Sequence, residues 1–175
     1  MKKLTAIVAA LALFFTATAA DPTPNNEFNS LFNLSNSKVV NADNVNKAIT
    51  SAFSQKFTKA TSVSWKENQG LYFAYFKQYE TEYAAAYNDE GNMIALSRSL
   101  ATDALPLALH EALYSDYKDH NIPTTVTEIV MDGETAYYLT VEDKSAHKQL
   151  KCTPSGSISV IKKLKKKVLV GRVEV

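Results

Sequence analysis

The sequence has few of the residues that support covalently stabilised or metal-dependent folds. Its 175 residues include one cysteine, Cys152, with five glycines and five prolines. A single cysteine cannot form an internal disulfide, so the fold has to be held by packing alone. A buried, inert thiol is the simpler interpretation of Cys152, and a reactive thiol is the alternative.

Catalytic and metal-binding motifs are also missing. There is no Gly-x-Ser-x-Gly sequence, no phosphate-binding glycine loop and no Cys–His signature. His110 and Glu111 lie on a predicted helix, but no second histidine follows at the spacing of a zinc-binding helix. His120 and His147 are expected in loops, exposed to solvent. We therefore expect no enzyme, no metal site and no cofactor.

Long apolar runs are absent after residue 20. Lys2 and Lys3 precede a short apolar stretch, 4–15, and small residues at 17–20 offer a cleavage site. This order is typical of a secretory signal peptide, and the stretch is short for a membrane span. No cysteine follows it, so no lipoprotein anchor is expected. The pattern predicts a periplasmic or secreted protein that has no membrane span after cleavage of residues 1–20.

Neither sign of charge dominates. The whole chain has 19 Lys and Arg against 18 Asp and Glu, and losing Lys2 and Lys3 changes its net charge from +1 to about −1. Nothing in this balance predicts a nucleic-acid partner. The remaining 155 or so residues suffice for one domain with a hydrophobic core.

Residues 21–42 are rich in Asn, Ser and Pro, which is typical of a flexible leader. Four apolar residues interrupt this polarity and leave open the alternative of a segment that docks weakly: Phe28, Leu31, Phe32 and Leu34.

Two stretches repeat one pattern. Residues 62–76 read SVSWKENQGLYFAYF and residues 125–139 read TVTEIVMDGETAYYL, so that Gly70 aligns with Gly133. Each stretch predicts a hairpin, over 61–77 and 124–142. Asp132-Gly133 is a strong two-residue turn signal because both positions of such a turn need positive φ, and Gln69-Gly70 is a weaker version.

A helix is predicted before each of these hairpins. Asp43 or Asn44 can cap the first helix, and Pro106 fits the first turn of the second. Apolar residues at helical spacing form one stripe per helix: Val45, Ala48, Ile49, Ala52, Phe53 and Phe57, then Leu105, Leu109, Ala112, Leu113 and Tyr117. Further hairpins over 82–98 and 148–163 place Gly91 opposite Gly156.

These elements predict one α+β domain, 43–167, made by duplication, with repeats 43–100 and 101–167 and a tail, 168–175. Each repeat has one helix and about four antiparallel strands, with the helices packed on one face of the sheet. The more apolar strand face, which carries Val63 and Trp65 in the first repeat, is expected under the helices.

The second sheet face is mixed and is the first candidate binding surface. Its larger apolar side chains offer contact area for a partner: Phe73, Tyr75, Ile129, Met131 and Tyr138. The alternative is that these are ordinary half-buried strand residues.

A lysine run near the C-terminus is the second candidate. It comprises Lys162, Lys163, Lys165, Lys166 and Lys167. Such a patch could bind phosphate or lipid headgroups, whereas lysines on a terminal strand also prevent edge-to-edge pairing.

Three segments carry a family resemblance: 53–76, FSQKFTKATSVSWKENQGLYFAYF; 85–98, AAYNDEGNMIALSR; and LPLALHEAL from Leu105. Over about Val45 to Lys165 the chain resembles the PepSY-like, β-lactamase-inhibitor-like (BLIP-like) proteins exported by Bacteroidota. The resemblance implies tandem helix-plus-sheet units without known catalysis. The inhibitor label reflects fold similarity to a protein that grips β-lactamase with an aromatic sheet face, and such similarity does not transfer a target.

The sequence thus predicts a non-enzymatic exported module that binds a protein or peptide of the cell envelope on the second sheet face, which is called the open face below. The alternative is an envelope-associated protein that binds a small ligand or an anionic surface through the lysine run.

Overall fold

The computed structural model of this chain describes residues 37–166. The predicted signal peptide, residues 21–36 of the predicted leader, Lys167 and the tail lie outside this range. In the described range, no helix is long and apolar enough to cross a membrane.

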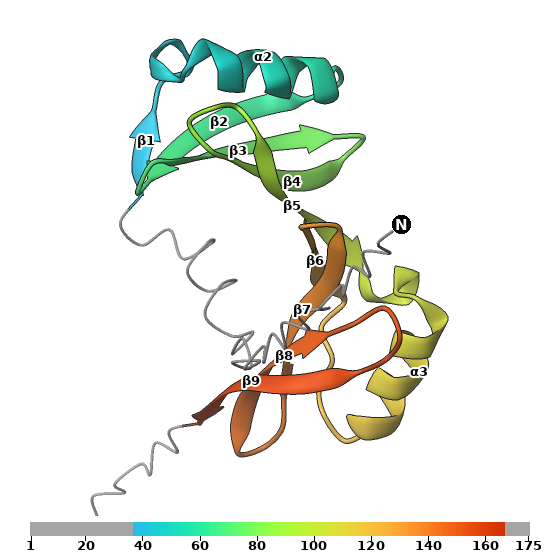
Figure 1. The fold of residues 1–175 in the computed structure, drawn as a ribbon. Helices are drawn as coiled ribbons and strands as arrows, with labels where there is room; N and C mark the ends of the chain where they lie inside the picture. The colour runs from blue at the N-terminus through green and yellow to red at the C-terminus, as the bar shows by residue number, and fades with distance from the viewer. Residues whose placement is uncertain (1–36, 167–175) are drawn as a thin grey trace, which may run out of the picture. The chain divides into compact units, whose positions relative to one another are not determined.

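A single antiparallel sheet organises the described residues, and its strand order is the order of the chain (Figure 1). Two α-helices are inserted, α2 (Lys47–Lys56) before the second strand and α3 (Leu107–Asp116) before the sixth. The nine strands of this range are β1 (Lys38–Val40), β2 (Thr61–Asn68), β3 (Leu71–Gln78), β4 (Thr81–Tyr87), β5 (Met93–Ala101), β6 (Thr125–Met131), β7 (Glu134–Glu142), β8 (Ala146–Cys152) and β9 (Ile158–Lys165).

Helix α2 begins later than the sequence predicts. Asn46 is its N-cap, and its side-chain oxygen accepts a hydrogen bond from the backbone N–H of Ala48 at 2.9 Å. Asp43 and Asn44, the expected caps, belong instead to a short 3-10 turn, Ala42–Asn44. Val45 is extended between the two and is buried, so the helix starts only after Val45 has entered the core.

Helix α2 packs on β2, β3 and β4 through an aromatic core. Phe53 contacts Trp65 and Phe76 edge-on, with ring centroids 5.3 and 5.1 Å apart. The buried members of this core alternate along the strands, as the predicted face requires: Val45, Ile49, Phe53, Phe57, Trp65, Ala74, Phe76, Ala85 and Tyr87. The predicted inward position of Trp65 is confirmed.

Helix α3 packs on a second core over β6, β7 and β8. It contains Leu105, Leu109, Leu113, Val126, Tyr137, Leu139, Val141, Leu150 and Cys152. Strand β5 joins the two cores, because Leu96 packs against the first and Leu100 against the second. These positions are four apart on one strand and therefore lie on one face, so both described helices cover the same face of the sheet, as predicted.

Val63 departs from the predicted pattern. The pairing of β2 with β3 shifts between Thr61 and Ser64, and Ser62 has a φ of 53°. At this bulge Val63 is 40% exposed, whereas the alternation predicts it buried beside Trp65.

Strand β1 occupies the end of the predicted leader. Lys38, Val39 and Val40 pair with Glu67, Lys66 and Trp65 of β2. The pairing extends the sheet by one strand that the Asn- and Ser-rich composition did not signal.

Two glycine turns lie against the helices. A Cβ atom on Gly91 would lie 2.9 Å from the carbonyl carbon and oxygen of Ala48 in α2. A Cβ atom on Gly156 would lie 2.8 Å from the carbonyl oxygen of Ala108 in α3. In each half, a turn between two strands thus touches the first turn of the helix, and only glycine fits there.

Candidate binding surface

The face of the sheet opposite the helices has a floor of small residues. Ala86 of β4 pairs with Phe73 on one side and with Ala95 on the other. In the next row, Ala84 lies between Tyr75 and Ser97. Small side chains therefore occupy the middle of this face over β4 and β5, between larger side chains on β3 and β6.

The larger side chains of this face differ in exposure. Phe73 is fully buried and Ile129 is 5% exposed. Tyr75, Met131 and Tyr138 are half-buried. Phe73 is therefore neither half-buried nor available to a partner, since its whole side chain is enclosed. Tyr75, Met131 and Tyr138 are the members of the predicted set that retain surface for a partner.

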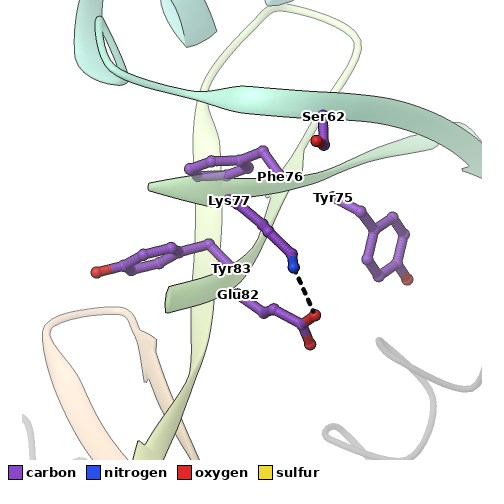
Figure 2. Close-up of a pocket in the computed structure, with 6 residues that line it drawn as sticks. All are labelled: Ser62, Tyr75, Phe76, Lys77, Glu82 and Tyr83. Atoms are coloured by element: carbon purple, nitrogen blue, oxygen red, sulfur yellow. Dashed lines mark ion pairs between the residues drawn. The ribbon is translucent and has the colours of Figure 1, made fainter. Parts of the chain in front are cut away.

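A pocket opens beside Tyr75, next to the β2 bulge (Figure 2). Its volume is about 250 Å³, and it is lined by Ser62, Tyr75, Phe76, Lys77, Glu82 and Tyr83. This volume is below the roughly 300–1,000 Å³ of typical small-molecule and cofactor sites. The pocket therefore suits a single side chain of a larger partner.

The walls of the pocket combine stacked rings with an ion pair. The rings of Phe76 and Tyr83 are nearly parallel, with centroids 5.4 Å apart. Lys77 Nζ lies 3.8 Å from Glu82 Oε1, and Figure 2 shows these side chains pointing toward one another. The pocket thus offers apolar rings at one side and both signs of charge at the other.

Tyr75 connects the pocket to the open face. Lys66 Nζ lies 5.2 Å from the centroid of its ring, within the range of a cation–π contact. Burial raises the pKa of the Tyr75 hydroxyl above its usual range. A neutral phenol with an apolar ring is a suitable contact for a protein or peptide.

The lysines of the run that lie in the described range do not share one face of the sheet. Lys162 pairs with Gln149, on the face away from α3, whereas Lys163 and Lys165 pair with Lys148 and Ala146 on the helix face. Lys166 Nζ binds Glu142 Oε2 at 3.1 Å. The run lies at the end of the described sheet, which agrees with the predicted edge position.

The structure contains an ion pair between β5 and β6 that the sequence did not predict. Arg98 donates two hydrogen bonds to Glu128, from Nε to Oε1 at 2.7 Å and from Nη2 to Oε2 at 3.0 Å. These bonds hold the pKa of Arg98 above its ordinary value. Burial, followed by the Glu128 carboxylate, raises the pKa of the neighbouring Tyr137. The pair fills the helix face between Leu96 and Leu100, where the two cores meet, which indicates a structural role.

The histidines are less solvated than expected. His147 lies in β8, and its Nδ1 is 3.1 Å from Glu142 Oε1. His120 is half-buried, with Nε2 2.8 Å from Lys148 Nζ and 3.4 Å from Asp143 Oδ2. Within residues 37–166, no group of three or more His, Cys, Asp or Glu could hold a metal ion.

Asp143 organises the loop beside His120. Its Oδ1 accepts hydrogen bonds from the hydroxyl and backbone N–H of Ser145 and from the backbone N–H of Ala146, at 2.7–2.8 Å. These bonds hold the pKa of Asp143 well below its usual range, and Lys148 adds to the effect. The carboxylate serves the loop, which explains the cluster without a catalytic role.

No known protein family matches the sequence, and a search of curated proteins finds no match. Solved structures do match. A BLIP-like protein from Bacteroides fragilis has a TM-score of 0.58 and 21% identity, covering 74% of this chain and 91% of that one.

Two further structures from the same genus match equally well. A DUF2874 family protein from Bacteroides ovatus has a TM-score of 0.59 at 22% identity over 68% of this chain and 86% of that one. A protein named as periplasmic, from Bacteroides eggerthii, has a TM-score of 0.60 at 15% identity. The match covers 69% of this chain and 88% of that one. The chain therefore has the α+β fold of BLIP-like and DUF2874 proteins of Bacteroides.

Proposed function

We propose that this chain is an exported, non-enzymatic binding module that holds a protein or peptide of the cell envelope on the open sheet face. Tyr75, Met131 and Tyr138 form the contact surface, and one side chain of the partner enters the pocket beside Tyr75. The pocket is the observation that carries the proposal, because Tyr75, Lys77 and Glu82 of its lining lie on the open face and its volume suits a single side chain.

The proposal includes two finer inferences. The chain is a PepSY-like protein exported by its N-terminal signal peptide, and its two halves arose by duplication. Matching contacts support the duplication, because Gly91 against Ala48 in the first half corresponds to Gly156 against Ala108 in the second. The names of the structural neighbours give no target for this chain, since a shared fold hosts many functions.

In the test, the mature protein is immobilised on a resin and incubated with a periplasmic extract of the source organism. The affinity of the mature protein for the protein that it captures is then measured. Truncating an aromatic anchor at an interface costs about 2 kcal/mol, or roughly 30-fold in affinity. We expect a loss of this size for Tyr75→Ala and for Tyr138→Ala. Tyr114→Ala is the matched control, because Tyr114 is exposed on α3 and lies away from the open face.

Circular dichroism and urea titration establish that each variant is folded. A folded Tyr75→Ala, Tyr138→Ala double variant that binds the captured protein as the parent does would refute the proposal.

A further inference from the structure

Strand β9 is an eight-residue strand at one end of the described sheet. It hydrogen-bonds to β8 on one side, and no strand of the described range lies on the other. Val160 and Leu164 are 50% and 51% exposed along it. The strand at the opposite end, β1, has only three residues. An exposed strand edge offers unpaired backbone groups to another chain, so β9 is the longer available edge.

The lysines of β9 alternate between the two faces of the sheet, with Lys162 on one and Lys163 and Lys165 on the other. A flat anionic surface would meet the lysines of one face only. A peptide strand added beside β9 also projects its side chains alternately to both faces, so carboxylates on both faces could reach these lysines.

These three lysines have no partner of opposite charge in the described range. Lys162, Lys163 and Lys165 form no ion pair and no side-chain hydrogen bond with any residue between 37 and 166. By contrast, Lys148 is held by Asp143 at 3.3 Å and Lys166 by Glu142 at 3.1 Å. The charge pattern of β9 is thus positive and uncompensated.

We propose that the free edge of β9 binds an extended acidic peptide, which adds to the sheet as a further strand. Backbone hydrogen bonds would supply affinity for any extended peptide, and the lysines would select peptides with carboxylate side chains. The pairing of β8 with β9 shifts between Gln149 and Leu150, so Val160 lies opposite Leu150 on the helix face and Leu164 opposite His147 on the other. The two residues therefore provide one apolar contact on each face. The same lysines disfavour a second copy of this chain, since paired copies would set like charges opposite one another.

The test measures binding of a fluorescein-labelled ten-residue peptide of alternating Glu and Val to the mature chain by fluorescence anisotropy. Three other probes are compared: the same peptide with two central Val replaced by Pro, a peptide of alternating Lys and Val, and vesicles of phosphatidylglycerol. We expect the Glu–Val peptide to bind, more weakly at high salt, and the Pro peptide, the Lys peptide and the vesicles to bind at least tenfold more weakly.

Variants then locate the site. The triple variant Lys162→Glu, Lys163→Glu, Lys165→Glu should lose about tenfold in affinity, from three exposed charge pairs. The matched control reverses three exposed lysines elsewhere: Lys47→Glu, Lys56→Glu and Lys118→Glu. Tyr75→Ala should leave peptide binding unchanged, so this test and that of the open face fail independently.

Each contrary outcome overturns the proposal. Equal binding of the Glu–Val and Pro peptides would show attraction by charge without strand addition. Binding to vesicles with no preference for the peptide would establish an anionic-surface site, and the absence of peptide binding to the mature chain would show that the edge is not available.

Discussion

Replacing Gly91 by alanine tests whether helix α2 rests on the turn between β4 and β5. Gly91 has a φ of +90°, and its added Cβ would lie 2.9 Å from the backbone carbonyl of Ala48. Gly70 is the matched control, because its φ is +80° but an added Cβ would meet nothing within 4 Å. The two substitutions share a conformational cost and differ in the steric one.

The magnitudes follow from this difference. A left-handed conformation costs an L-residue about 1–2 kcal/mol, so Gly70→Ala should lower the free energy of unfolding by about 1 kcal/mol. The Cβ at Gly91 presses on helix backbone, which cannot rotate away as a side chain can, and overpacking typically adds about 1–3 kcal/mol. Gly91→Ala should therefore cost about 2–4 kcal/mol. In the second half, Gly156→Ala should be the more costly substitution and Gly133→Ala the control, because an added Cβ would meet Ala108 only at Gly156.

The assay is urea unfolding of the mature protein, followed by Trp65 fluorescence and circular dichroism, with the m-value compared between variants. If Gly91→Ala and Gly70→Ala differ by less than about 0.5 kcal/mol at equal m-value, α2 does not rest on this turn and the reasoning fails.

Trp65→Ala should lower the free energy of unfolding by about 3–5 kcal/mol, because it empties the centre of the aromatic core; a loss below about 1 kcal/mol would contradict its burial. Tyr87→Phe should raise stability by about 1 kcal/mol in the same titration, because the buried hydroxyl has no hydrogen-bond partner within residues 37–166; a clear loss would reveal a partner. Cys152 is buried and its pKa is raised to about 12, so labelling by a thiol reagent at pH 8 should be slow without urea, and rapid labelling would place the thiol outside the core. The pKa of Asp143 is lower in the folded than in the unfolded protein, so its carboxylate stabilises the fold fully above the unfolded pKa of about 4. This stabilisation is lost as pH falls toward the folded pKa. The loss of unfolding free energy caused by Asp143→Ala should therefore shrink when unfolding is measured below a pH of about 4.

Turns that require glycine made two of the hairpins predictable. Asp132 and Gly133 have φ values of 51° and 79°, as a two-residue hairpin turn requires, and Gln69-Gly70 repeats this geometry. The turn between β3 and β4 also has two positive φ values, but they belong to Tyr79 and Glu80. Neither residue signals such a turn, so this hairpin depends on the strands around it.

Other features were set by contacts that are distant in sequence. Asp43, Asn44 and Asn46 are all suitable caps, and the burial of Val45 decides among them. The Arg98–Glu128 pair depends on the register between β5 and β6, which no local pattern specifies. Away from the β2 bulge, alternation along a strand predicted which face a residue occupies, but not which residues on that face would be enclosed.

The candidate surface shows the same limit. Alternation correctly placed Phe73 and Tyr75 on one face of β3, yet Phe73 is enclosed and Tyr75 borders a pocket. That pocket lies beside a bulge at Ser62, where a non-glycine residue takes positive φ without a sequence signal.

The identity between strand order in the sheet and order in the chain has a kinetic consequence. Every strand pair in the described range joins neighbours in the sequence, and each helix packs mainly on the strands that follow it. The contact order of this part is therefore low for a protein that is mostly sheet, and little loop-closure entropy has to be lost before contacts form. Such a chain should refold faster than a β-sandwich of equal size, in which strands that are far apart in the sequence must meet first.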